Sequence, residues 1–314
     1  GARAAKDPSR LGRVGGQADH RGLIGAFAQV DQNLRKLRKR EGILAERRRS
    51  RPTSGREAEH AVLLEPQQSY ALEVLDSLVD QGVKFVVATG RHHVDVRSIR
   101  DALGLDIYLI TSNGAVVHDK QDQLVYNQAL PSTVAAELIA MERDPSIHIN
   151  VYYGDEWLVE EELPWLLQFH HDSGFSYRLA DLASHPKDRV NKVFYIGDHD
   201  KLLKIEAHLN QQYGDRINVT FSLPDCLEVM HAGVHKGNAV RAVLEQHGLE
   251  MSQAVAFGDG MNDFEMLSMV GRGVVMGNAH DRLKQALPEH EQTLTSDEDG
   301  VAVYLEKLFA SQTR

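Results

Sequence analysis

The stretch Val255-Ala256-Phe257-Gly258-Asp259-Gly260-Met261-Asn262-Asp263 decides the fold. It begins as a continuous apolar run, too short for a helix, which predicts a strand buried on both faces of a parallel sheet. It then ends in two carboxylates, a carboxamide and two glycines. Asp259 and Asp263 could supply the oxygen ligands that Mg²⁺ prefers, with Asn262 hydrogen-bonding an anion. The alternative is a plain turn in which Asp263 caps a helix over 264–269.

Short apolar runs, alternating with apolar residues at helical spacing, recur along the chain from Tyr70 onward. Apolar residues at helical spacing predict helices from Tyr70 to the stop at Gly82 and over 94–103. Further strands are predicted at 84–90, 108–114 and 273–277, each ending in Gly or a small polar residue. Alternating strands and helices imply an α/β fold, a parallel sheet covered on both faces, whose ligands bind at the carboxyl ends of the strands.

The middle of the chain, 132–223, has a different pattern. Helices are predicted over 134–141 and 165–170, and strands with more polar alternation over 147–153, 192–196 and 217–222. This predicts an inserted α+β domain, with core domain segments at 57–131 and 224–314.

Composition narrows the class of protein. The chain has 314 residues, 42% hydrophobic and 25% charged, which is typical of a folded globular protein of more than one unit. No apolar run is long enough to span a bilayer, so we expect no membrane partner. The single cysteine, Cys226, excludes an internal disulfide and favours a reducing cytoplasm.

Charge is divided unevenly between the amino-terminal segment and the rest. Residues 1–56 hold 15 Lys and Arg against 5 Asp and Glu, whereas the remaining 258 residues carry a balance of −20. The charge and composition of residues 1–56 predict a solvated, poorly ordered arm, with at most a short helix within 22–46. The alternative is that the basic stretch 35–51 binds nucleic acid through phosphate contacts, which we consider the less favoured reading.

Two further strings are candidates for anion binding. Lys236 stands at the start of a helix predicted from Ala239 to His247, where a cation is unfavourable unless an anion is also bound. Thr89 and Gly90 end a predicted strand, and the hydroxyl and backbone amides there could hold phosphate oxygens. The adjacent pairs His92-His93 and His170-His171 would point apart, so the sequence predicts no metal site at either.

Four strings together resemble one family in order and spacing. They are Ala88-Thr89-Gly90-Arg91, Thr111-Ser112-Asn113-Gly114-Ala115, His235-Lys236-Gly237-Asn238-Ala239 and Gly258-Asp259-Gly260-Met261-Asn262-Asp263. The chain resembles the Cof-type phosphatases of the haloacid dehalogenase (HAD) superfamily over roughly residues 70–309, most closely the sugar-phosphate and pyridoxal-phosphate phosphatase group. The resemblance implies a doubly wound sheet with a large inserted cap, and Mg²⁺-dependent hydrolysis of a small phosphorylated metabolite, with no obligate protein partner.

The resemblance also implies a role for each matching residue. Thr89 and Gly90 would bind the transferred phosphoryl group, and Asn262 would contact phosphate. Lys236 would bind the phosphate and neutralise its charge. Asp259 would ligate Mg²⁺, with Asp263 supporting the metal site, so that Lys236, Asp259 and Asp263 form the catalytic set.

The first motif of the family is missing from this sequence. It is a strand ending in Asp-x-Asp-Gly-Thr, whose first Asp attacks phosphorus and whose second is the general acid/base. No such string occurs, and Glu57-x-Glu59 is a poor substitute because an extra methylene displaces the attacking oxygen. We therefore expect a sheet that lacks its middle strand, and interpret residues 1–64 as the product of a shifted reading frame, a damaged gene or a chimeric start. Impaired hydrolysis is the expected function, and phosphate binding without catalysis is the alternative.

Overall fold

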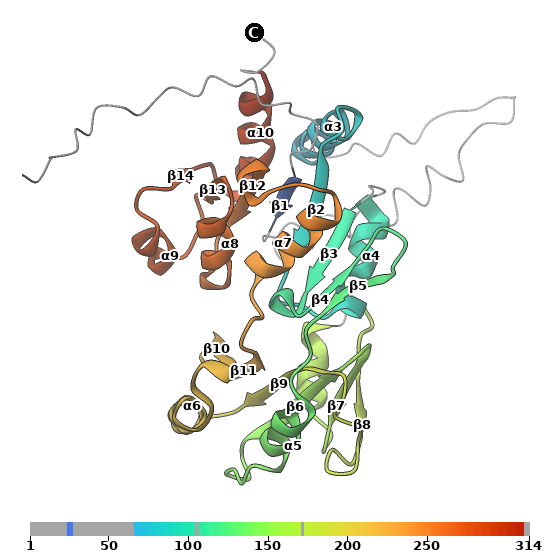
Figure 1. The fold of residues 1–314 in the computed structure, drawn as a ribbon, viewed down its shortest axis with the longest axis vertical. Helices are drawn as coiled ribbons and strands as arrows, with labels where there is room; N and C mark the ends of the chain where they lie inside the picture. Colours follow the sequence, from blue (N-terminus) through green and yellow to red (C-terminus); the bar gives the residue numbers. More distant parts are fainter. Residues whose placement is uncertain (1–23, 28–65, 104–106, 171–172, 311–314) are drawn as a thin grey trace, which may run out of the picture.

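The protein consists of a core built on one sheet and a cap built on a second sheet. The computed structural model describes residues 24–27, 66–103, 107–170 and 173–310 (Figure 1). The predicted α/β core with an inserted α+β unit is confirmed by the two separate sheets.

The core sheet of the described residues has eight strands, and the first six in its spatial order run parallel. In spatial order they are β14 (Glu291–Gln292), β13 (Arg272–Val275), β12 (Ala254–Gly258), β1 (Ile24–Phe27), β2 (Lys84–Ala88), β3 (Ile107–Thr111), β4 (Val116–His118) and β5 (Leu124–Asn127). The last two strands pair antiparallel and form one edge. β12 is buried along its whole length, as its continuous apolar run predicts.

The middle strand of this sheet is present, and its position corrects the sequence prediction. Ile24–Phe27 forms β1, which pairs in parallel with β2 on one side and β12 on the other. The sequence predicted an unpacked basic segment here, or a short helix, and a sheet without its central strand. That prediction overlooked Ile24–Phe27 because the run is only four residues long and lies among charged and glycine-rich residues. The rest of 1–56, together with Glu57 and Glu59, lies outside the described residues.

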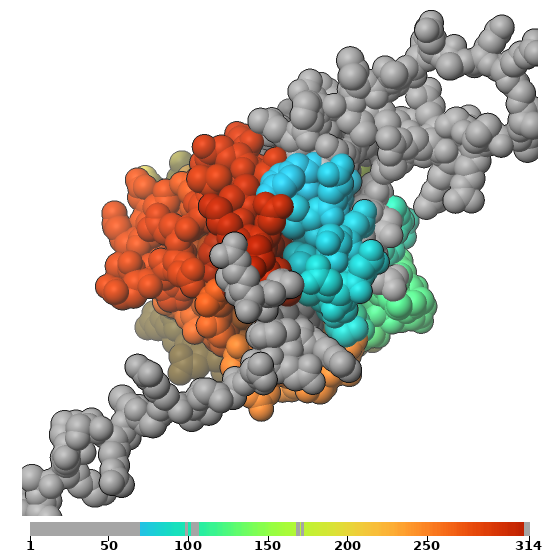
Figure 2. Space-filling view, turned by 90° about the horizontal axis from the view of Figure 1, so that it is seen from above, coloured from blue at the N-terminus to red at the C-terminus, as the bar shows by residue number. Residues whose placement is uncertain are grey.

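Among the residues that the structure describes, six helices accompany the core sheet. They are α3 (Pro66–Asp80), α4 (His93–Leu103), α7 (Lys236–Gln246), α8 (Phe264–Met269), α9 (Asp281–Ala286) and α10 (Gly300–Ala310). Figure 2 shows α3 and α10 side by side on one face of the molecule, where the Tyr70 hydroxyl donates to Glu306 Oε2 at 2.8 Å. Apolar side chains of these helices and of the sheet form one continuous buried cluster. Burial of this kind is the dominant stabilising contribution to such a core.

The described part of the cap has a six-stranded sheet and two α-helices. The sheet order is β10 (Ile217–Leu223), β11 (Cys226–His231), β9 (Val190–Ile196), β6 (His148–Tyr153), β7 (Glu156–Val159) and β8 (Tyr177–Leu179), and the helices are α5 (Ser132–Ala140) and α6 (His199–Tyr213). β11 pairs with both β9 and β10, so the cap sheet extends beyond residue 223, where the sequence predicted its end. The predicted helix over 165–170 is a 3₁₀ segment, Pro164–Phe169.

Within the described residues, no helix is both long and apolar enough to cross a lipid bilayer.

Candidate active site

Three parallel strands of the core bring the predicted phosphate and metal residues to one edge. β2 is followed by Thr89, β3 by Ser112, and β12 by Asp259. The loops are joined by backbone hydrogen bonds: Asn113 N donates to Thr89 O at 3.1 Å, and Ser112 N donates to Arg91 O at 2.8 Å. Carboxyl ends of parallel strands are the usual position of ligand sites in such sheets.

Lys236 and Asp263 form a buried ion pair at this edge. Lys236 Nζ donates to Asp263 Oδ1 at 2.7 Å, and the two side chains are only 3% and 1% exposed. The other oxygen of Asp263 accepts from the backbone amides of Asp259 and Gly260, both at 2.9 Å. Asp263 therefore holds the turn after β12 and fixes the ammonium group at the start of α7. A buried charge pair of this kind is stable only when its remaining hydrogen-bonding capacity is satisfied.

Asp259 is the carboxylate of this edge with the fewest partners. It is half-buried, and its Oδ2 accepts a single 3.2 Å hydrogen bond from Asn278 Nδ2. Burial, and next the nearby charge of Asp263, raise the pKa of Asp259, whereas Lys236 lowers it. Asp259 and Asp263 carry two negative charges, whereas Lys236 carries one positive charge. The donor set therefore fits a hard cation such as Mg²⁺.

Asn262 and Asn113 link the site to the cap. Asn262 Nδ2 donates to Asn113 Oδ1 at 3.0 Å, and Asn113 Nδ2 donates to Glu228 Oε2 at 2.8 Å. Glu228 lies on β11 of the cap and also accepts from Lys192 of β9 at 2.8 Å. A continuous polar chain therefore runs from the core loop into the cap. We name Asn113, Lys236, Asp259, Asn262 and Asp263 the carboxyl-edge cluster.

Sequence reasoning missed Asn113, Glu228 and Lys192 as members of this chain. Asn113 adopts the left-handed backbone conformation (φ 58°), and Gly114 follows at φ 102°. An Asn-Gly pair after a strand signals such a turn, and this was the available clue. Glu228 and Lys192 come from strands of the cap, and only the folded chain brings them together.

Thr89 and Gly90 are close to the cluster without a side-chain contact to Lys236 or Asp259. Thr89 is buried, and its Oγ1 accepts from Arg91 N at 3.2 Å. A Cβ atom at Gly90 would lie 2.8 Å from Asn113 Oδ1, so glycine permits the close approach of these two loops. The structure thus brings together all the predicted site residues at one edge.

The strand that would carry the missing first motif lies at the centre of this edge. Phe27, the last residue of β1, is in register with Val87 of β2 and Phe257 of β12. In the sequence, Phe27 is followed by Ala28-Gln29-Val30, so no carboxylate occurs before Asp31.

A doubly wound sheet with a charged carboxyl edge and an inserted cap defines a hydrolase of the haloacid dehalogenase type. The family model described as haloacid dehalogenase-like hydrolase matches residues 65–305, and the chain belongs to this family.

Relatives with sequence similarity carry phosphatase names. A putative phosphatase of Haemophilus influenzae is 40% identical over 241 residues, which cover 76% of this chain and 89% of the relative. An HMP-PP phosphatase of Escherichia fergusonii is 39% identical over 217 residues, 69% of this chain and 80% of the relative. A solved haloacid dehalogenase-like hydrolase from Bacteroides thetaiotaomicron superposes with a TM-score of 0.69 at 26% identity, covering 91% of this chain and 99% of its own. The chain is therefore a phosphatase by resemblance.

Proposed function

We propose that the carboxyl-edge cluster binds the phosphate group of a small phosphorylated metabolite together with Mg²⁺, and that hydrolysis by this chain is impaired. The observation that carries the proposal is the buried Lys236–Asp263 pair beside the half-buried Asp259. One cation and one under-compensated carboxylate at the strand ends support the proposed binding of a phosphate dianion and its metal. The phosphatase names of the relatives support the same substrate class.

Each residue has a distinct task in this proposal. Lys236 donates to a phosphate oxygen while Asp263 keeps its ammonium group in place. Asn262 donates through its amide, and Thr89 offers backbone and hydroxyl groups at the end of β2. Asp259 holds the metal, which when bound offsets phosphate charge and polarises the phosphoryl oxygens. Phosphoryl transfer depends mainly on such positioning and electrostatic stabilisation.

The cap supplies the second half of the proposed pocket. The hydrogen bonds from Asn262 through Asn113 to Glu228 tie the phosphate end of the site to β11. Specificity would therefore come from cap side chains next to this connection. We further propose a cytoplasmic location, supported by the single cysteine in the sequence.

The decisive experiment separates binding from turnover. The unmodified chain should bind inorganic phosphate in the presence of Mg²⁺ by calorimetry, yet hydrolyse p-nitrophenyl phosphate barely above background. Ala28 and Val30 are the first and third residues after Phe27 in the sequence. The double substitution Ala28→Asp with Val30→Asp, which recreates Asp-x-Asp at this place, should yield Mg²⁺-dependent turnover.

Two controls complete this test. Asp259→Asn in the Asp-x-Asp background should abolish the Mg²⁺-dependent turnover, because the proposed metal ligand is lost. Brisk turnover by the unmodified chain, abolished by Glu57→Gln, would show instead that a glutamate is the nucleophile. The proposal that hydrolysis is impaired would then be wrong.

A further inference from the structure

A second cluster of polar side chains lies between the core and the cap and includes neither Lys236 nor Asp263. His93 begins α4, His118 ends β4, and Asp155 lies in the turn between β6 and β7 of the cap. One donor atom from each of the three lies within 4.8 Å of the other two. All three line a cavity of about 240 Å³. We name them the histidine cluster.

The two imidazoles of the cluster are buried and stacked. His93 is 4% and His118 is 7% exposed, and their ring centroids are 3.5 Å apart with planes at 15°. The Nδ1 atom of each ring is buried without a hydrogen-bond partner among the described residues. A buried polar atom without a partner costs about 1–3 kcal/mol, so a metal ion or a water in this cavity that contacted both atoms would be stabilising.

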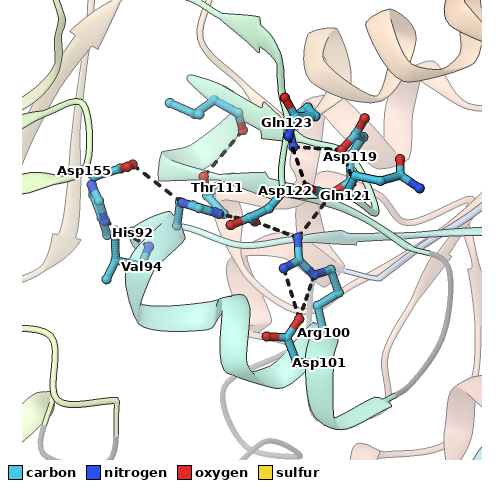
Figure 3. A network of polar contacts seen from close by, with 12 residues as sticks. His92, Val94, Arg100, Asp101, Thr111, Asp119, Gln121, Asp122, Gln123 and Asp155 are labelled. Carbon is cyan, nitrogen blue, oxygen red and sulfur yellow. Dashed lines mark hydrogen bonds and ion pairs between the residues drawn. The ribbon is translucent and has the colours of Figure 1, made fainter.

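The hydrogen bonds of His93 leave its Nδ1 as an electron-pair donor. His93 Nε2 lies 2.8 Å from Asp122 Oδ1. The same oxygen accepts from Arg100 Nη1 at 2.7 Å (Figure 3). Burial would raise the pKa of Asp122, but the hydrogen bonds from His93 and Arg100 lower it, so the carboxylate is ionised and can only accept. In the neutral ring, Nε2 therefore carries the proton and Nδ1 carries the lone pair. A carboxylate behind an imidazole is the usual support of a metal-ligating histidine.

Asp155 is held close to the two rings by the cap. His92 Nδ1 accepts from Val94 N at 3.2 Å, so His92 Nε2 donates to Gly154 O, 2.9 Å away. This bond fixes the turn whose next residue is Asp155, and Asp155 Oδ1 lies 3.6 Å from His93 Nδ1. Figure 3 shows the Asp155 carboxylate directed toward the polar network that contains Asp122 and Arg100. Its side chain is 73% exposed and is free to close on a ligand.

We propose that His93, His118 and Asp155 bind a divalent transition-metal ion of the Zn²⁺ class, which bridges the core and the cap. Two nitrogens and one carboxylate are a donor set for Zn²⁺ rather than for Mg²⁺, which prefers oxygen ligands alone. Tetrahedral Zn²⁺ with bonds of about 2.0–2.1 Å places its donors roughly 3.3 Å apart. The donors, which lie within 4.8 Å of one another, must therefore move closer, and the stacked rings must turn until both nitrogens point at one ion. Arg189 also lines the cavity, but its guanidinium lies over the Tyr153 ring, 4.7 Å from the centroid.

The sequence prediction concerned a metal site formed by the adjacent pair His92-His93, and the proposed site does not use that pair. His93 instead meets His118 from the adjacent strand, which only the folded sheet reveals. The site requires no part of the carboxyl-edge cluster, so it stands or falls separately from the proposed phosphatase activity.

Calorimetry with ZnCl₂ on chelator-treated full-length protein tests the proposal. We expect binding that is weakened at least about 10-fold by His118→Phe, which keeps a stacking ring but removes the donor, and also by Asp155→Asn. His247→Phe is the matched control, because His247 Nε2 is likewise buried without a partner but belongs to no donor group in the described residues. It should leave the affinity unchanged.

Co²⁺ provides a readout of the ligand set that does not depend on activity. The visible absorption of the Co²⁺ protein should be intense, as for a tetrahedral site, and should be lost in His118→Phe. Unchanged Zn²⁺ affinity in both His118→Phe and Asp155→Asn would overturn the proposal, because the metal would then be bound elsewhere on the chain. If only Asp155→Asn were without effect, the bridge to the cap would be wrong. Asp155 is exposed, so its variant remains informative even if His118→Phe fails to fold.

Discussion

The carboxyl-edge cluster and the histidine cluster differ in whether their buried polar groups have hydrogen-bond partners. In the first, Lys236, Asp263, Asn262 and Asn113 are paired with one another before any ligand is bound. In the second, two buried Nδ1 atoms have no partner among the described residues. The first arrangement stabilises the folded chain by itself, whereas the second lowers its stability until a ligand is bound.

This difference teaches how a binding site can be distinguished from a structural network. Removing one member of a paired network should lower the free energy of unfolding, because its partner is left buried and unpaired. Removing one member of an unpaired cluster should lower the free energy of unfolding only slightly, or raise it. The three predictions below use this contrast, beginning with the largest effect.

Removing the ammonium group of Lys236 should cause the largest loss of stability. Lys236→Met keeps most of the buried side-chain volume but leaves Asp263, 1% exposed, without its charged partner. Breaking a buried pair from one side typically costs about 3–5 kcal/mol. Urea denaturation should show this loss in the free energy of unfolding.

An exposed ion pair provides the control for this measurement. Lys201 Nζ lies 2.9 Å from Asp144 Oδ2, and the two side chains are 39% and 44% exposed. Lys201→Met should cost less than about 1 kcal/mol, because surface pairs contribute little. Equal losses in the two variants would mean that Lys236 does not form the buried ion pair with Asp263 in the folded protein.

Much of the core was predictable because each element has a local signal. The buried strand β12 follows directly from a continuous apolar run, and α4 from helical periodicity over 94–103. The gathering of Asp259 and Lys236 followed from the rule that parallel strands end at one edge. Their catalytic roles remain predictions, because the structure gives their positions and not their chemistry.

The elements that escaped prediction depend on contacts distant in sequence. β1 has only four residues, and its pairing with β2 and β12 stabilises it more than its own sequence does. β11 belongs to the cap because of its pairing with β9, although the chain has by then passed the predicted boundary. The histidine cluster joins a helix, a strand and a cap turn, so no spacing of histidines in the sequence could have indicated it.

A substitution at Gly114 should cause an intermediate loss, since this glycine allows the carboxyl-edge cluster to form. Gly114 has φ 102°, and an added Cβ would lie 2.6 Å from the carbonyl oxygen of His235, just before Lys236. Gly114→Ala should therefore cost about 3 kcal/mol or more, from backbone strain and from displacement of the start of α7. Thermal or urea denaturation measures the loss.

Gly82 separates the two contributions to that loss. It has φ 88°, but no atom lies within 4 Å of an added Cβ. Gly82→Ala should cost only the backbone strain, about 1–2 kcal/mol. If Gly114→Ala cost no more than Gly82→Ala, the close approach of the 112–114 turn to α7 would not contribute to stability.

The smallest effect, and the one of opposite sign, is expected in the histidine cluster. His118→Phe removes a buried nitrogen without a partner and keeps a ring that can stack on His93. In the presence of EDTA the free energy of unfolding should rise by about 0.5–1 kcal/mol, because no other group loses a hydrogen bond.

The gain should increase as the pH falls from neutral toward 5. The folded state keeps His118 neutral, with a pKa of about 4, so the unfolded chain binds the extra proton first and the unmodified protein loses stability in that window. Urea denaturation at both pH values measures the difference. A loss of more than about 2 kcal/mol at neutral pH would show that the imidazole contributes to the fold as Lys236 does, and the contrast between the two clusters would disappear.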